Sequence, residues 1–65
     1  MKLIVNGEPR EASAPTLDEA LDELGFGGRT VATALNGAFV PVRKRPDTAL
    51  ADGDRLEVLT PMQGG

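Results

Sequence analysis

Hydrophobic residues occur in short runs separated by turn-forming pairs, a pattern that predicts strands joined by hairpins. The first run, residues 3–5, ends at Asn6 and Gly7, a pair that favours the positive φ angles of a tight hairpin turn. The returning arm, about residues 9–12, is polar and begins with Pro9. Because proline lacks the N–H that a central strand needs, we expect this second arm to lie at an edge of a sheet.

An amphipathic helix is expected after this hairpin. Residues 16–19 read Thr-Leu-Asp-Glu, the form of a capping box, in which the Thr16 hydroxyl and the Glu19 carboxylate each bind a free backbone N–H. Gly25 can take the left-handed position that ends a helix. One face is apolar at helical spacing and consists of Leu17, Ala20, Leu21 and Leu24. A helix of about two turns does not persist alone, so it must pack on a sheet.

The second half of the chain repeats the hairpin pattern. Residues 31–35 and 39–42 flank Asn36 and Gly37, which predicts another tight turn between two strands. After the turn at residues 52–54, residues 55–59 alternate between polar and apolar, so one more strand should place its apolar side chains, Leu56 and Val58, toward the core.

Two other segments are interpreted as plain connections. The basic run at residues 43–46 suits either a solvated turn or an anion-binding patch, and we favour the turn because it has no aromatic neighbours. The glycine-rich residues 25–28 follow a helix, whereas a phosphate-binding loop precedes one, so a loop without ligand is favoured.

The order of these elements predicts an α+β domain over residues 1–60. We expect a mixed sheet of four to five strands packed on one short helix. If the helix makes the crossover, the first and last strands pair in parallel at the sheet centre, an arrangement found in the β-grasp fold. Residues 61–65 should form a flexible C-terminal tail, because Pro61 stops strand pairing and no apolar periodicity follows it.

Composition argues against catalysis by this chain. A domain of 65 residues buries only about 60 % of the surface that its unfolded chain exposes, so an enclosed substrate pocket would compete with the core for volume. The sequence has no histidine and no cysteine, which leaves no neutral-pH imidazole base, no thiol nucleophile and no usual metal-ligand set. We therefore predict a protein that is not an enzyme and binds no metal or cofactor.

Net charge and hydropathy limit the classes of partner that the chain is expected to bind. The net charge of −3 gives no overall attraction to a phosphate backbone, so nucleic acid is not an expected partner. No apolar run is long enough to span a bilayer, so no membrane partner is expected either. The lack of cysteine suits a reducing compartment, and we expect a cytoplasmic protein.

The last five residues are the strongest functional signal. Extended, they reach about 17 Å at roughly 3.3 to 3.6 Å each, enough to bring a terminal carboxylate into the active site of a partner. Gly64 and Gly65 have no β-carbon, so a narrow tunnel can admit them. The alternative is that glycine simply occurs at a frayed chain end. The segment comprises Pro61, Met62, Gln63, Gly64 and Gly65.

Several segments together carry a family resemblance: residues 35–37, 40–41, 50–59 and 61–65. They resemble the thiamine-biosynthesis sulfur carriers, the ThiS family, over essentially the whole chain. The most specific element combines the acidic turn at 52–54, the final strand and the Gln-Gly-Gly end, since all ubiquitin-like proteins share a bare Gly-Gly end. Residues 43–47 match no family pattern that we recognise.

The resemblance implies a β-grasp, ubiquitin-like fold and a sulfur relay. An E1-like adenylyltransferase would use ATP and Mg²⁺ to join the Gly65 carboxylate to AMP. A persulfide from a cysteine desulfurase or another sulfur donor would then displace AMP, leaving a thiocarboxylate at Gly65. Thiazole synthase would receive this sulfur for the thiazole ring of thiamine.

Alternatives remain open from the sequence. The same chemistry would serve a carrier of the type of the molybdopterin synthase small subunit, and Gln63 is the reason to prefer thiamine. A protein-conjugating modifier, or a ubiquitin-like binding module that works through its sheet face, would share the fold. Phe39 and Leu59, with Met62, are candidates for a partner surface near the tail, although burial of Phe39 in the core is an equal expectation.

Overall fold

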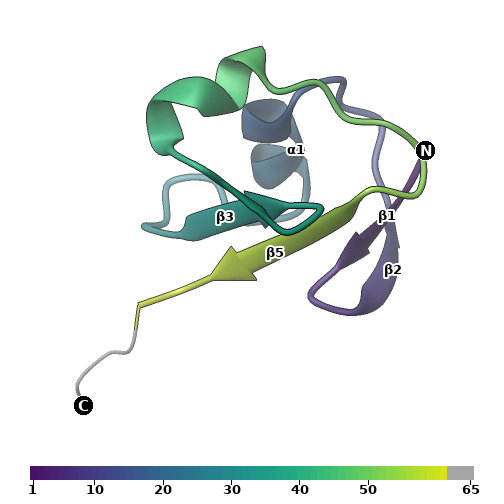
Figure 1. Cartoon of the computed structure of the whole chain (residues 1–65), viewed down its shortest axis with the longest axis horizontal. Coiled ribbons are helices and arrows are strands. Elements are labelled where there is room, and N and C mark those ends of the chain that lie inside the picture. The colour runs from purple at the N-terminus through teal and green to yellow at the C-terminus, as the bar shows by residue number, and fades with distance from the viewer. Residues whose placement is uncertain (62–65) are drawn as a thin grey trace.

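The computed structural model describes residues 1–61 and has the predicted α+β architecture with one addition, a short 3₁₀ helix (Figure 1). The predicted tail residues Met62, Gln63, Gly64 and Gly65 lie outside the described residues, so the division of the chain at residue 60 stays a prediction. In chain order the elements are β1 (Lys2–Val5), β2 (Glu8–Glu11), α1 (Leu17–Glu23), β3 (Ala32–Leu35), β4 (Ala38–Val40), η1 (Val42–Asp47) and β5 (Arg55–Leu59).

The strands form one five-stranded mixed sheet in the order β2-β1-β5-β3-β4. The last strand, β5, occupies the centre, parallel to β1 and antiparallel to β3. α1 lies across one face of the sheet (Figure 1). The parallel pairing of the first and last strands confirms the predicted β-grasp arrangement.

Both hairpins turn at an Asn-Gly pair in the left-handed region, as predicted. The φ angles are 51° at Asn6 and 86° at Gly7, and the second hairpin repeats them closely. In the first hairpin Ile4 lies opposite Pro9. Hydrogen-bonded and non-bonded pairs alternate from the turn, so Pro9 falls at a non-bonded position and its missing N–H costs no ladder bond.

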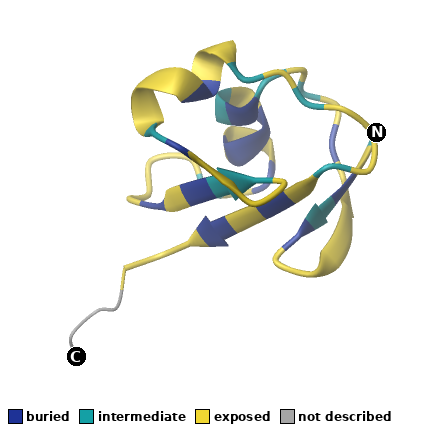
Figure 2. Cartoon of the chain, in the orientation of Figure 1, coloured by how far each residue is buried: buried dark blue, intermediate teal, exposed yellow. Residues whose placement is uncertain are grey.

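The core lies between α1 and the face of the sheet that α1 covers (Figure 2). Leu3, Leu17 and Leu56 are fully buried within it. The predicted apolar face of the helix is confirmed, since all four of its side chains are 8 % exposed or less. Gly25 ends the helix with a φ of 96°, also as predicted.

The predicted capping box is wrong. Thr16 occupies the N-cap position but makes no side-chain cap bond, and its hydroxyl donates to Asp18 Oδ1 at 2.6 Å instead. The N–H of Leu17 donates to the backbone C=O of Thr48 at 2.9 Å. The segment after η1 therefore satisfies one of the backbone N–H groups left free at the start of α1 by a tertiary contact.

The interpretation of residues 43–46 as a solvated turn is wrong for Arg45. This side chain is 9 % exposed; its Nε donates to Thr33 Oγ1 at 3.1 Å and its Nη2 to the Val31 C=O at 2.7 Å. Arg43 and Lys44 remain exposed. Arg45 thus fastens η1 to the start of β3, because a guanidinium reaches two acceptors at once.

Candidate functional site

The predicted working tail follows β5, the central strand of the sheet. β5 pairs with a neighbour on both sides, and its side chains alternate, with Leu56 and Val58 at 0 % and 4 % exposure and Leu59 exposed (Figure 2). This confirms the predicted orientation of the strand. Pro61, the last described residue, follows Leu59 by two positions and is exposed.

Phe39 and Leu59 lie on the sheet face opposite α1. They are 70 % and 68 % exposed, so the expectation that Phe39 is buried is wrong and its exposure is a finding. Strand register explains why: Ala34 lies opposite both Phe39 and Glu57, and Ala32 lies opposite Leu59. The small alanine side chains leave a shallow hollow of about 70 Å³ between the two large ones. We call Phe39, Leu59 and these two alanines the outer patch.

A second hollow of about 520 Å³ lies beside the outer patch, with Glu57 on the border of both. The charged side chains that line it are Arg55 and Glu57. Within residues 1–61, no three carboxylate, imidazole or thiol groups gather closely enough to hold a metal ion. The same part of the chain has no helix long and apolar enough to cross a membrane.

Val42, the first residue of η1, is the exposed apolar side chain that the sequence analysis missed. It is 67 % exposed and borders a different hollow, shared with the end of α1. The structure therefore brings Phe39 and Leu59 together and leaves Val42 apart. Strand alternation would place Val42 on the same face as the buried Val40. The change from strand to 3₁₀ helix after Pro41 breaks this alternation and leaves Val42 exposed.

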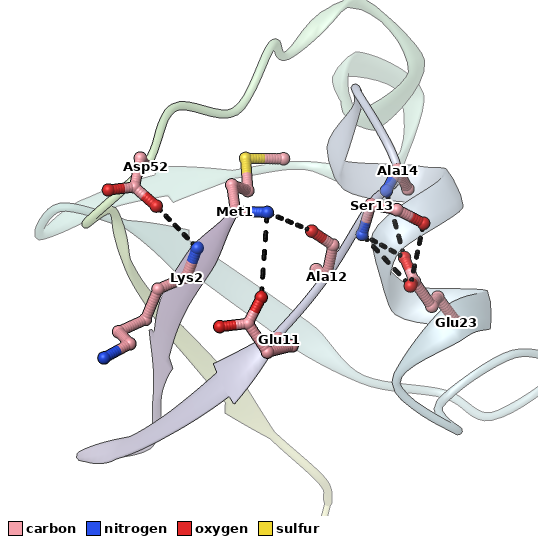
Figure 3. Close-up of polar contacts among 8 residues, drawn as sticks. All are labelled: Met1, Lys2, Glu11, Ala12, Ser13, Ala14, Glu23 and Asp52. Atoms are coloured by element: carbon pink, nitrogen blue, oxygen red, sulfur yellow. Dashed lines mark hydrogen bonds and ion pairs between the residues drawn. The ribbon is translucent and has the colours of Figure 1, made fainter.

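Polar contacts near the start of β1 connect the N-terminus, the segment after β2 and the end of α1 (Figure 3). The Met1 amine donates to the Ala12 C=O at 2.8 Å. The Glu23 carboxylate accepts bonds at 3.0 Å from the backbone N–H groups of Ser13 and Ala14. These donors favour the ionised form and lower the pKa of Glu23 from its ordinary value. The Met1 amine and the Glu23 carboxylate both bond to backbone groups, so these contacts have a structural role in the fold.

Comparison with known proteins decides the family. The sequence model of the ThiS family matches residues 3–65. The chain belongs to the ThiS family. It is therefore a sulfur carrier protein of thiamine biosynthesis, a carrier and not an enzyme. The family match favours thiamine biosynthesis over the alternative of a molybdopterin synthase small subunit.

Individual ThiS relatives agree with this assignment. The sulfur carrier protein ThiS of Thermus thermophilus is 44 % identical over 61 residues, which cover 94 % of this chain and 95 % of that protein. The crystal structure of the thiamine biosynthesis protein ThiS from Geobacter metallireducens superposes with a TM-score of 0.79 at 35 % identity, over the whole of both chains. That likeness confirms the fold.

One relative is much longer than this chain. A protein named thiazole synthase from Paramagnetospirillum magneticum is 42 % identical over 66 residues. The match covers all of this chain but only 20 % of that protein. A ThiS-like segment thus forms part of the polypeptide that carries this name.

Proposed function

We propose that the Gly65 carboxylate carries the sulfur, with Met62, Gln63 and Gly64 as the tail that brings it into a partner's active site in the cytoplasm. An E1-like adenylyltransferase binds ATP and Mg²⁺, and the carboxylate attacks the α-phosphate with release of pyrophosphate. A persulfide from a cysteine desulfurase or another donor displaces AMP. A thiol then cleaves the resulting acyl disulfide, and the sulfur stays on Gly65 as a thiocarboxylate.

The observation that carries this proposal is the family match through residue 65. The chemistry supports it independently. A carboxylate is a poor acyl electrophile because its charge is delocalised, and adenylation supplies the leaving group that sulfur needs. Since the sequence contains no cysteine, the chain has no thiol on which to hold sulfur as a persulfide. A carboxylate must then carry it, and the family match through residue 65 favours the one at Gly65.

Thiazole synthase is the proposed acceptor of the sulfur. Support comes from the long relative, in which a ThiS-like segment belongs to a protein named thiazole synthase. Joining two proteins that act together raises the effective concentration of one near the other. A carrier and a thiazole synthase that are separate chains would have to come together by docking.

We also propose that the outer patch docks on the adenylyltransferase. Its two large side chains are exposed apolar groups on one face, and such clusters commonly mark contact surfaces. Leu59 belongs to the strand that leads into the tail. A partner that binds the tail is therefore brought close to Leu59, and Phe39 lies beside Leu59 on the same face.

The proposal predicts that one alanine added after Gly65 abolishes adenylation and leaves the fold intact. The added residue follows β5 in sequence by several positions, and changes near chain ends are commonly tolerated, so thermal melting should be unchanged. A reacting carbon one residue further on is misplaced for attack on the α-phosphate. Pyrophosphate release with the adenylyltransferase reports activation, with Gly64→Val as a milder variant. Adenylation of the extended chain at the wild-type rate would show that Gly65 is not the reacting residue.

A further inference from the structure

The parallel ladder between β1 and β5 ends before β5 does. Its last residue pair is Val5 with Leu56, and its last backbone bond runs from the Asn6 N–H to the Leu56 C=O at 2.9 Å. The chain then turns away at Asn6 with a φ of 51°. In a continued parallel ladder the next β5 residue to bond on this side would be Val58.

The side chain of Asn6 completes the ladder where its backbone leaves it. Its Oδ1 accepts from the Val58 N–H at 2.8 Å, and its Nδ2 donates to the Val58 C=O at 3.1 Å. The side-chain amide thereby takes the place of a peptide group from a continued strand. Without it, both backbone groups of Val58 would lose these partners.

Asn36 has the equivalent position at the other end of β5. It occupies the same turn position in the second hairpin with the same φ of 51°. Its Oδ1 accepts from the Arg55 N–H at 2.9 Å, and its backbone N–H donates to the Arg55 C=O at 2.7 Å. The central strand is thus held by one asparagine at its start and by another at its end.

Turn geometry alone does not require asparagine, because glycine or aspartate also serves at this position. What Asn6 adds is a pair of bonds to a residue 52 positions along the chain. Val58 immediately precedes Leu59 of the outer patch and lies three positions before Pro61. These bonds therefore act at the root of the segment that leads to Gly65.

We infer that Asn6 is a positioning residue for the reactions at the C-terminus, an inference that rests on the proposed function. By holding Val58 from the β1 side, it fixes where Leu59 and the following residues leave the sheet. Without it, the end of β5 is paired with β3 alone, through Leu59 and Ala32. A partner must then order the frayed strand end before the carboxylate reaches its reacting geometry.

The test compares three variants by pyrophosphate release with the adenylyltransferase, at varied carrier concentration. Asn6→Gly keeps the positive φ and removes both bonds, and Asn36→Gly is the matched control at the other end of β5. We expect Asn6→Gly to raise KM for the carrier about five- to thirtyfold, the cost of ordering roughly one residue, with kcat within about twofold of wild type. Asn36→Gly should leave KM unchanged. Asn6→Asp keeps the acceptor for the Val58 N–H and should lie between wild type and Asn6→Gly.

Amide hydrogen exchange on the isolated chain reports the positioning without any partner. Exchange at Val58 should accelerate in Asn6→Gly and not in Asn36→Gly. If Asn6→Gly fails to fold, Asn6→Asp takes its place in both measurements. Unchanged exchange at Val58, or equal KM values for the two glycine variants, overturns the positioning role alone. No adenylation of the wild-type chain overturns the proposed function and this role with it.

Discussion

Replacing the buried Arg45 by methionine should destabilise the domain without touching the tail. Methionine keeps most of the apolar stem and removes the donors to Thr33 and Val31. Two hydrogen bonds from a charged group contribute about 1.5 to 3 kcal/mol each. Within the described residues Arg45 forms no ion pair, so its removal also relieves the cost of burying a charge. We expect a net loss of about 2 to 3 kcal/mol in the free energy of unfolding.

That loss is large for so small a domain. It should lower the melting temperature by roughly 4 to 8 °C for each kcal/mol. Urea denaturation gives the free energy directly, and the exposed neighbour Lys44→Met is the control, expected within about 0.5 kcal/mol of wild type. Arg45→Lys should recover little, because an ammonium lacks the planar fork that reaches both acceptors. Equal denaturation midpoints for Arg45→Met and Lys44→Met would refute the bracing role of Arg45.

Two further predictions concern the outer patch and Glu23. Phe39→Ser should raise KM for the carrier in adenylation about tenfold, since the few interface residues that dominate binding, often large side chains at its centre, cost more than about 1 kcal/mol when truncated. Val42→Ser, about equally exposed on a different hollow, should leave KM unchanged. Equal KM values for these two variants would count against docking through the patch. Because the folded pKa of Glu23 lies below its ordinary value of 4.5, its contribution to stability is present above that pH and is lost as the pH falls through the folded pKa. Urea midpoints of wild type and Glu23→Gln should therefore converge in acid and separate toward neutral pH, and a gap that persists in acid would contradict this linkage.

Local patterns were enough to predict much of the fold. The Asn-Gly pairs specify their turns directly, since few residues adopt the positive φ angles that these turns require. Alternation along residues 55–59 predicted which side chains of β5 face the core. The parallel pairing of β1 and β5 was permitted by the single helix between the two hairpins and implied by the family resemblance.

The errors arose where distant segments meet. At the start of α1 the Thr16 hydroxyl bonds Asp18 and the Leu17 N–H finds its acceptor in Thr48. The local capping pattern therefore predicted bonds that do not form. Of the three basic residues at 43–45, only Arg45 becomes buried, because η1 directs its side chain toward Thr33. Composition alone cannot distinguish Arg45 from its two neighbours. For the candidate site, the tail was evident as a motif, whereas the bonds from Asn6 to Val58 depend on strand register across the sheet.

The central claim, that sulfur is carried on the Gly65 carboxylate, is tested most directly by intact-mass measurement. The chain is incubated with ATP, Mg²⁺, the adenylyltransferase, a cysteine desulfurase, cysteine and a thiol reductant, and a reaction without ATP is the control. We predict an increase equal to replacing one oxygen by sulfur, dependent on ATP and located at Gly65 by fragmentation of the C-terminal peptide. An unchanged mass, or sulfur located at any other residue, would contradict the account.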